Sequence, residues 1–478
     1  MEQIVHATAA QFVGRERERR VLEQAWASSV GAFVPVYGRR RIGKSTLLLH
    51  FLEKKRGLYH VGKVAPAELQ VRELLQTAAA VLEQPLLGQL ATTTWKEAIE
   101  QVEQAWPKNE RMVLVLDEFQ GTCSASPELP SVLQELWDRK WKKSGRVMLV
   151  LCGSFVGFME REVLGKKSPL YGRRTAQIHL QPLDWYESTL LHPHWGLEQQ
   201  TEAYFLCGGV PQYLLTFDPK KSVRTNIEAT LLDEFAPLYR EPEFLLREEL
   251  REVEKYHAVL YAVANGHGTQ RQIAQATGLP ERSLHYWLEQ LVQLGYVARR
   301  FPLSLGPKNR RKVRFVLEDP LLKFWFRFVF PHKSALAYLG PVRTYAQHIK
   351  PELDAYFGGC FERLCRETLP TLLRSEDVAA SLEVGEYWND GVQIDVVGVR
   401  DDGWVELGEC KWGSVHSVGA LRKELERKVT AFPNAPGATL RSHCFVRQLG
   451  HGFKPSRGEH WHTLEQMYRV CKAEHRSR

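Results

Sequence analysis

The fold is decided by the stretch Val34-Pro35-Val36-Tyr37-Gly38-Arg39-Arg40-Arg41-Ile42-Gly43-Lys44-Ser45-Thr46. An apolar segment comes first, then a loop bounded by two glycines, then the start of a helix that continues as an apolar run. The loop matches the pattern G-x-x-x-x-G-K-[ST] in full, in which glycines let successive backbone N–H groups turn inward around a phosphate. The helix adds its N-terminus to the same anion site. The stretch therefore predicts a buried strand, a phosphate-binding loop and a helix.

Individual residues of this loop have distinct expected roles. Lys44 is expected to reach the β- and γ-phosphates, and the Ser45 hydroxyl to hold Mg²⁺. ATP with Mg²⁺ is therefore the predicted cofactor. A basic surface turn is the alternative, and the apolar flanks count against it. The predicted nucleotide-binding residues of the loop are Gly38, Arg39, Arg40, Arg41, Ile42, Gly43, Lys44, Ser45 and Thr46.

A second apolar run, residues 111–119, contains two adjacent carboxylates near its end. An unbroken apolar run is typical of a buried parallel strand, which delivers polar residues at its C-terminal end. Asp117 is expected to hold Mg²⁺ through water, and Glu118 to polarise the attacking water. Such an acid pair often marks no more than a strand end, but its place after a full phosphate loop favours the catalytic interpretation.

Two further segments carry candidates for sensing the γ-phosphate. The apolar run 147–154 ends in Gly-Ser, so Ser154 either lies between the carboxylates and the phosphate or simply ends a strand. Arg173 and Arg174 stand on a loop before another predicted strand. They are candidate catalytic contacts to the γ-phosphate, supplied within the chain or from a neighbouring subunit. Solvated surface arginines are an equal alternative.

These motifs, taken in order, resemble a known family. The phosphate loop, "VLDEF", "LCGS", "YGRRT" and "GGVPQYL" are similar to the archaeal-type ATPase family of prokaryotes, P-loop proteins close to the STAND and AAA+ groups. The resemblance covers roughly residues 11–330. It implies an α/β ATPase core over residues 1–183 and a helical lid over residues 184–250. It also implies that the segment from Phe12 to Glu18 lies over the adenine.

The middle of the chain, residues 251–330, has the pattern of a winged helix. Thr269 caps a short helix that ends at Gly278, a second helix follows, and two short strands then predict a hairpin rich in arginine and lysine. Such a module binds DNA or docks a protein partner. The aromatic run 317–329 is interpreted as a joint between domains. The candidate DNA contacts are Arg282, His285, Tyr286, Arg299, Arg300, Arg310, Arg311 and Lys312.

Residues 331–478 are predicted to form a smaller α/β domain with a carboxylate site. Asp395 and Glu409 fall on neighbouring predicted strands, and Lys411 shares a face with Glu409 because strand residues two apart point the same way. Glu362 arrives from near the start of a preceding helix. Carboxylates with room for water suit Mg²⁺ or Mn²⁺. A metal-bound water, oriented or activated by Lys411, is a nucleophile for phosphate chemistry.

This arrangement of D…E-x-K after a helical glutamate resembles the PD-(D/E)xK nucleases. The resemblance implies a restriction-endonuclease-like fold, catalytic roles for Asp395, Glu409 and Lys411, and metal ligation by both acids and Glu362. The chain departs from the pattern because Ile394 stands where a proline precedes the first acid. A solvated ion pair, or a degenerate fold that only binds DNA or a partner, is the alternative.

Composition sets the remaining limits. The chain has 478 residues, 44% of them hydrophobic, and a net charge of +8, which permits a nucleic-acid partner without requiring one. Its 8 cysteines form no C-x-x-C pair and are expected to be reduced thiols. No apolar run approaches a membrane span and the N-terminus lacks a signal-peptide pattern, so a cytoplasmic location without membrane contact is expected.

The sequence as a whole predicts an ATP-hydrolysing, DNA-associated protein whose nucleotide state regulates a C-terminal metal-dependent nuclease. The alternative is an ATP-dependent switch that binds DNA or a protein partner and cuts nothing. A homo-oligomer is also considered, because an arginine at position 173 or 174 can act across a subunit boundary.

Overall fold

A computed structural model describes residues 12–305, 312–415, 417–434, 437–450 and 459–477 of the chain. The chain divides into two compact units. The first is Met1–Leu183 with Val210–Gln212, and the second is Asp184–Gly209 with Tyr213–Arg478.

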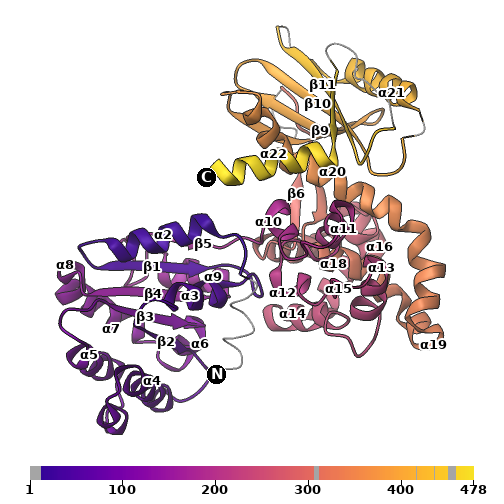
Figure 1. Cartoon of the computed structure of the whole chain (residues 1–478). Helices are drawn as coiled ribbons and strands as arrows, with labels where there is room; N and C mark the ends of the chain where they lie inside the picture. The colour runs from indigo at the N-terminus through magenta and orange to yellow at the C-terminus, as the bar shows by residue number, and fades with distance from the viewer. Residues whose placement is uncertain (1–11, 306–311, 416, 435–436, 451–458, 478) are drawn as a thin grey trace. The chain divides into compact units, whose positions relative to one another are not determined.

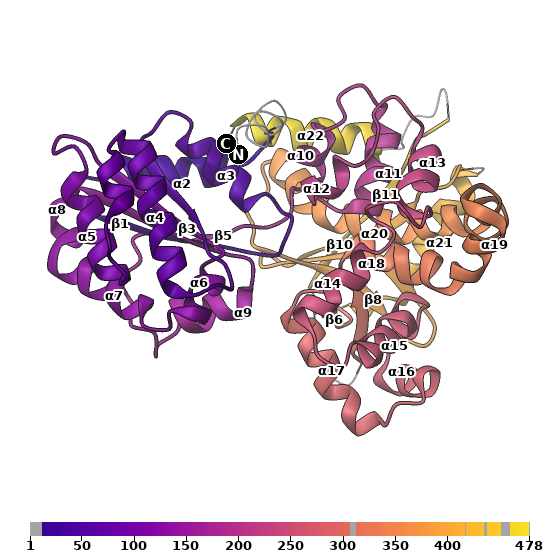
Figure 2. The ribbon, with the colours of Figure 1, turned by 90° about the horizontal axis from the view of Figure 1, so that it is seen from below.

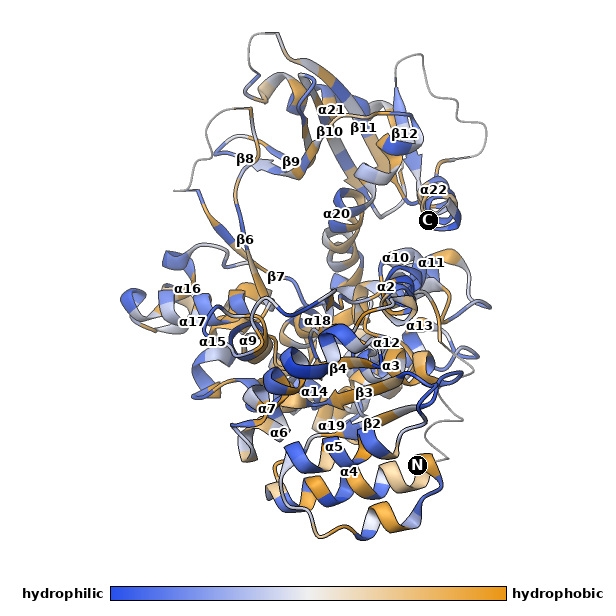
Figure 3. Cartoon of the chain, turned by 90° about the vertical axis from the view of Figure 1, so that its left-hand side faces the viewer, coloured by the Kyte–Doolittle hydropathy of each residue, from blue (hydrophilic) through white to orange (hydrophobic). Residues whose placement is uncertain are grey.

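The first unit is built on a five-stranded parallel sheet in the order β2-β3-β4-β1-β5. Every residue of β1, β3 and β4 is buried, as required of parallel strands covered on both faces. Figure 3 shows the hydrophobic colouring of β3 and β4. The predicted α/β class with a parallel core is therefore confirmed. The strands are β1 (Ala32–Tyr37), β2 (Gly57–Val61), β3 (Met112–Asp117), β4 (Val147–Gly153) and β5 (Ile178–His179).

Helices connect these strands and complete the core. One hydrophobic cluster joins Leu114 and Leu149 of the sheet to Leu74, Ile99 and other buried residues of the covering helices. Because all five strands are parallel, their C-terminal ends share one edge, where the phosphate loop, the end of β3 and the end of β4 come together (Figure 1). The helices are α2 (Glu16–Ala27), α3 (Lys44–Leu52), α4 (Ala67–Leu82), α5 (Trp95–Ala105), α6 (Phe119–Ala125) and α7 (Leu129–Leu136).

The second unit begins with a group of helices. Residues 211 and 212 of α12 belong to the first unit, whereas the rest of α12 belongs to the second, so this short helix spans the division. The α-helices of the group are α10 (Trp185–Thr189), α11 (Leu197–Cys207), α12 (Pro211–Leu214), α13 (Val223–Asn226) and α14 (Glu241–Glu249).

Three helices and a two-stranded antiparallel sheet follow, and Figure 2 shows the helices gathered beside β6. Thr269 accepts a hydrogen bond from the N–H of Gln272 at 3.2 Å, and Gly278 ends α16 in a left-handed conformation with φ of 69°. Leu284, Leu288 and Leu291 are buried on one face of α17. The elements are α15 (Val253–Ala264), α16 (Gln270–Thr277), α17 (Glu281–Gln293), β6 (Val297–Arg300) and β7 (Arg314–Leu317).

The aromatic run is packed inside this unit. It forms α18 (Pro320–Phe324) and the π-helical turn η5 (Trp325–Val329), and the rings of Trp325, Phe326 and Phe328 are buried. The indole N–H of Trp325 donates to the carbonyl of Tyr239 at 2.7 Å. These rings are therefore structural and are not a surface for stacking bases.

The C-terminal part has a five-stranded mixed sheet in the order β12-β11-β10-β9-β8. The strand pairs from β8 to β10 are antiparallel, and those from β10 to β12 are parallel. The helix α20 is 26 residues long, so Glu362 lies in the middle of a helix, and the prediction that it stands near a helix start is wrong. The elements are α20 (Lys350–Ser375), β8 (Leu382–Trp388), β9 (Gln393–Arg400), β10 (Trp404–Lys411), α21 (Val418–Ala431), β11 (Thr439–Val446), β12 (His460–Thr463) and α22 (Leu464–Ser477).

The helices after residue 184 and the C-terminal sheet contact each other directly within this unit. The Phe205 ring of α11 meets Trp412, which follows β10, edge to face at 5.2 Å between centroids. Trp185 meets Tyr468 of α22 at 5.9 Å. Asp184 pairs with His475 at 2.8 Å. Two regions far apart in sequence therefore share one core.

Candidate functional site

The phosphate loop connects β1 to α3 in the predicted way. Gly38 and Gly43 have φ values of 151° and 89°, which glycine adopts without strain. A Cβ at Gly38 would lie 2.3 Å from the carbonyl oxygen of Leu180, so only glycine fits there. The Lys44 ammonium donates to the carbonyl oxygens of Gly38 at 2.9 Å and Arg39 at 2.8 Å. Burial lowers the pKa of Lys44.

Asp117 stands at the end of β3 and accepts hydrogen bonds from several neighbours. The Ser45 hydroxyl donates to its Oδ2 at 2.7 Å, and the backbone N–H of Glu118 donates to its Oδ1 at 2.8 Å. The Tyr59 hydroxyl of β2 donates to Oδ2 as well. Burial and the adjacent carboxylate raise the pKa of Tyr59, which keeps its proton on the oxygen. Sequence reasoning missed Tyr59; its only signal was a polar ring in a short strand that pairs with β3.

Glu118 is held by the side chains of two neighbours. The Ser154 hydroxyl donates to its Oε2 at 2.8 Å, and the Gln120 amide donates to the same oxygen. Gln120 also donates to Ser154 at 3.1 Å, which closes a small network. Glu118 itself has φ of 48°, a conformation found at strained functional positions. The predicted residues Ser45, Asp117, Glu118 and Ser154 are thus brought together at one edge of the sheet, and Gln120 joins them.

The two candidate arginines have different surroundings. Arg173 makes a bidentate ion pair with Asp138, through Nε at 3.0 Å and Nη2 at 2.7 Å. Arg174 is exposed. Nothing in the sequence indicates the pairing with Asp138, which lies 35 residues away. The pair occupies part of the donor capacity that a γ-phosphate contact by Arg173 requires.

The candidate DNA contacts fall into exposed and paired positions. Arg282, His285 and Tyr286 are exposed on α17, and Lys312 is exposed as well. Arg299 pairs with Glu289 and Arg300 with Glu318, so part of the positive charge expected on the hairpin is neutralised by acids outside it. Arg310 and Arg311 lie outside the described residues.

In the C-terminal sheet, Asp395 and Glu409 occupy adjacent strands and are buried, at 6% and 2% exposure. The register pairs Val405 with Val399 and Gly408 with Val396, so its continuation sets Glu409 opposite Asp395 on the same face. Asp395 Oδ2 accepts a hydrogen bond from the N–H of Cys410 at 3.0 Å.

The charges around this pair differ from the expected set. Lys428 of α21 forms a buried ion pair with Glu409, while Lys411, at 52% exposure, lies 3.3 Å from it. Burial, followed by the charges of Glu362 and Glu409, raises the pKa of Asp395 to about 7. Burial also raises the pKa of Glu362. Sequence reasoning missed Lys428, because a lysine in a helical charged run gives no sign of pointing into a sheet.

No metal centre is assembled here. Within the part of the chain that the structure describes, no three His, Cys, Asp or Glu side chains are grouped so that they hold a metal ion. The predicted ligand set of Glu362, Asp395 and Glu409 is therefore not in place as three ligands. Cations lie beside two of these carboxylates: Lys428 pairs with Glu409, and Arg366 lies 4.0 Å from Glu362.

Comparison with known proteins identifies the first part of the chain. Residues 12–217 match a family model described as an ATPase domain predominantly from Archaea. Residues 325–424 match a second model, described as archaeal and bacterial proteins of unknown function. Among the described residues, no helix is both long and apolar enough to cross a membrane.

Two curated relatives and one solved structure are similar to this chain. An uncharacterized protein of Methanocaldococcus jannaschii is 27% identical over 421 residues, which span 87% of this chain and 91% of that protein. An uncharacterized ATP-binding protein of the same archaeon is 42% identical over 45 residues, 9% of this chain and 76% of that protein. The Walker-type ATPase of Pyrococcus abyssi shares the fold with a TM-score of 0.51 at 20% identity, over 67% of this chain and 97% of that one. Residues 12–217 are therefore similar to an ATPase domain found predominantly in Archaea, and they share the fold of a Walker-type ATPase.

Proposed function

We propose that the chain binds ATP with Mg²⁺ at the phosphate loop and hydrolyses it there. The observation that carries this proposal is the convergence of Ser45 on Asp117 at 2.7 Å, beside Glu118 and Ser154. A hydroxyl and a carboxylate are the oxygen ligands that Mg²⁺ prefers, so these residues fit the ion. Bound Mg²⁺ would neutralise charge on the β- and γ-phosphates.

In this proposal each residue has one task. Lys44 exchanges its two carbonyl partners for phosphate oxygens, and the loop backbone from Gly38 to Thr46 cradles the β-phosphate. Glu118 orients the attacking water after release from its bonds with Gln120 and Ser154. The Ser154 hydroxyl, at the edge of β4, is available to the γ-phosphate when Glu118 has turned.

Two substitutions test the ATPase site. Lys44→Ala is expected to abolish binding of a fluorescent ATP analogue, because it removes the phosphate-bound charge. Glu118→Gln is expected to leave binding intact and to stop phosphate release. Exposed Arg469, on α22, provides the matched control Arg469→Ala. Phosphate release by Glu118→Gln at the wild-type rate would exclude Glu118 as the base.

We infer that the nucleotide state reaches the C-terminal domain through α11. Residues 210–212 group with the first unit, whereas α11, which ends at Cys207, packs on Trp412 through Phe205. A shift of residues 210–212 on nucleotide binding is thereby passed along the chain to a helix in contact with the end of β10. The test is the protection of β10 amides from hydrogen exchange with and without ATP. Identical protection in both states would contradict the inference.

For the partner, we propose DNA bound by the winged-helix-type module of α15–α17 with β6 and β7. Exposed Arg282, His285 and Tyr286 on one side of α17 support this. Arg282→Ala is expected to weaken binding of labelled duplex DNA and to lower the salt dependence by about one unit in the logarithmic slope. Binding that is unaffected by salt or by this change would favour a protein partner.

A second candidate function is a metal-dependent nuclease at Asp395, Glu409 and Lys411, with Mg²⁺ or Mn²⁺. The placement of Asp395 opposite Glu409 on neighbouring strands favours it, because carboxylate oxygens on one face of a sheet are ligands that suit Mg²⁺ or Mn²⁺. Cleavage of single-stranded, duplex and branched DNA with Mg²⁺ or Mn²⁺, with and without ATP, tests it. Cleavage that disappears in Asp395→Ala and Lys411→Ala supports a nuclease. No cleavage while ATP hydrolysis persists leaves the non-cleaving switch.

A further inference from the structure

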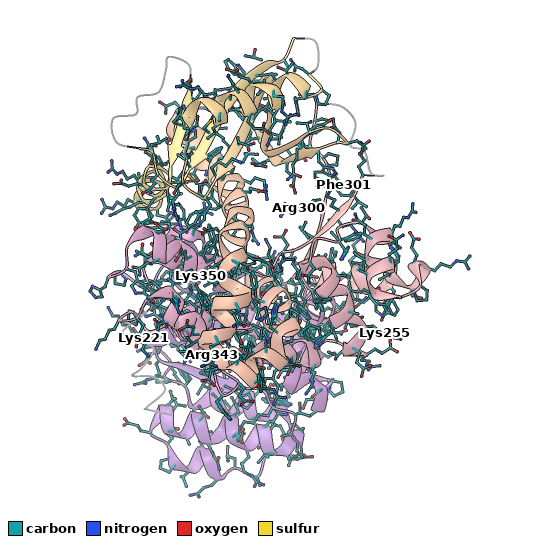
Figure 4. The ribbon with its side chains drawn as sticks, turned by 90° about the vertical axis from the view of Figure 1, so that its right-hand side faces the viewer. Lys221, Lys255, Arg300, Phe301, Arg343 and Lys350 are labelled. Carbon is teal, nitrogen blue, oxygen red and sulfur yellow. The ribbon has the colours of Figure 1, made fainter. Side chains whose placement is uncertain are left out.

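A small cavity of about 160 Å³ lies within the second unit, where the end of β6 meets β8. Three guanidinium groups, two carboxylates and one aromatic ring contribute to its lining: Arg299, Arg300, Phe301, Arg366, Glu383 and Glu386. Figure 4 shows Arg300 and Phe301 at the end of the hairpin strand, below the C-terminal sheet.

The cavity has fixed walls. The chain beyond β6 continues along β8, where the N–H of Leu303 donates to the carbonyl of Glu386 at 2.8 Å. Leu303 is buried in the hydrophobic cluster of the C-terminal sheet. A Cβ added at Gly385 would lie 3.2 Å from the Cβ of Leu303, so the segment after β6 approaches β8 closely.

The guanidinium groups are held in place but keep donors to spare. Arg299 pairs with Glu289, Arg300 pairs with Glu318, and Arg366 donates to the carbonyl oxygen of Asp395 at 2.6 Å. A guanidinium has five N–H donors, and one carboxylate takes at most two of them in a fork. Each arginine is therefore oriented by a partner inside the protein and has donors left for another anion. The three arginines also outnumber the two glutamates in the lining.

The volume of the cavity and the chemistry of its lining limit the class of ligand that it can bind. At about 30 Å³ for each water, the cavity has the room of roughly five waters, which suits a single phosphate group. Arginine forks match phosphate oxygens in a way that lysine does not. The Phe301 ring adds a surface against which a sugar or base can pack.

We propose that this cavity binds one phosphodiester group of a single nucleic-acid strand. Arg366 lines the cavity and also contacts the carboxylate site, because it donates to the backbone carbonyl of Asp395 and lies 4.0 Å from Glu362. A strand held here runs next to the paired carboxylates of β9 and β10. The proposal rests on the DNA association proposed above. It adds that a single strand is bound, and that this cavity is a second binding site beside the winged-helix-type module.

The test compares arginine variants of the full chain in binding a short labelled single strand. Arg300→Gln and Arg366→Gln are each expected to weaken binding about tenfold, as removal of a charge-assisted hydrogen bond implies. The logarithmic salt slope should fall by about 0.7 for each phosphate that the variant no longer neutralises. The control Arg469→Gln removes the same charge from an exposed position, 72% exposed, and should change neither quantity.

A charge-retaining variant and a comparison with duplex DNA distinguish failure of this proposal from failure of the DNA association. Arg366→Lys retains the charge and removes the fork, so it should keep the salt slope and still bind more weakly; it also serves if Arg366→Gln does not fold. Unchanged single-strand affinity in Arg300→Gln and Arg366→Lys, while Arg282→Gln weakens duplex binding, overturns the cavity proposal alone. Absence of binding to any nucleic acid by the wild type overturns both proposals. Inorganic phosphate that binds at the cavity while oligonucleotides do not would also overturn it.

Discussion

Replacing Lys428 by methionine should destabilise the C-terminal sheet strongly. Methionine keeps the length of the side chain and removes the ammonium that pairs with Glu409, whose side chain is 2% exposed. Lys411 remains 3.3 Å away, but it is half exposed and therefore screened by water. Breaking a buried ion pair by removing one partner costs about 3–5 kcal/mol. Because Asp395 stands opposite Glu409, two like charges are then left together without their buried cation.

Hydrogen exchange of peptides from β9 and β10 measures this effect locally, which suits a chain of two units that need not unfold together. A loss of about 3 kcal/mol corresponds to about a hundredfold lower protection. Lys423→Met on the same helix removes an exposed lysine and is the control. If the local free energy of opening falls by less than about 1 kcal/mol, or falls equally in the control, Lys428 is not the counter-ion of this site.

Three other predictions concern both units. Tyr59→Phe removes one donor to Asp117, so kcat for ATP hydrolysis should fall about fivefold, or by about 1 kcal/mol, with ATP binding kept. A parallel fall in ATP affinity would show that Tyr59 acts on binding instead. Because the pKa of Asp395 is raised to about 7 from about 3.9, the folded state binds the extra proton, and stability should decrease as pH rises from about 4 to 7. Asp395→Asn should flatten this decline in urea denaturation, and an unchanged slope would assign it to other groups. Gly38→Ala should prevent nucleotide binding in a fluorescence titration, since its Cβ meets the Leu180 carbonyl at 2.3 Å, and normal binding would mean that the loop relaxes.

The parallel core could be predicted because its signals are local. The phosphate loop, the apolar runs and the acids that follow them lie within short stretches, and parallel strands bring their ends to one edge by geometry alone. The partners of these residues could not be predicted in the same way. Tyr59 reaches Asp117 because β2 happens to pair with β3, and Asp138 reaches Arg173 across 35 residues of chain.

In the C-terminal region, too, contacts between residues far apart in the sequence could not be predicted. The strands β8, β9 and β10 could be predicted from their apolar residues, whereas β11 and β12 were not predicted; Asp395 and Glu409 do lie on neighbouring strands. The third expected acid, Glu362, sits in the middle of a helix that begins earlier than its apolar pattern indicated. The charge that completes the site comes from Lys428, on a helix 19 residues beyond Glu409. Which side of α21 faces the sheet depends on packing, and the charged run alone does not specify it.

The packing of Phe205 on Trp412 determines where this chain can be cut or recombined. A protein that ends at residue 330 would leave Phe205 without the ring of Trp412, and the C-terminal domain made alone would keep only Phe357 and Phe361 of the rings that pack on Trp412. Exposed aromatic patches of this kind promote aggregation. A chimera that exchanges the C-terminal domain between relatives should therefore include α11, with its boundary near residue 184 and not at Lys350, where α20 begins.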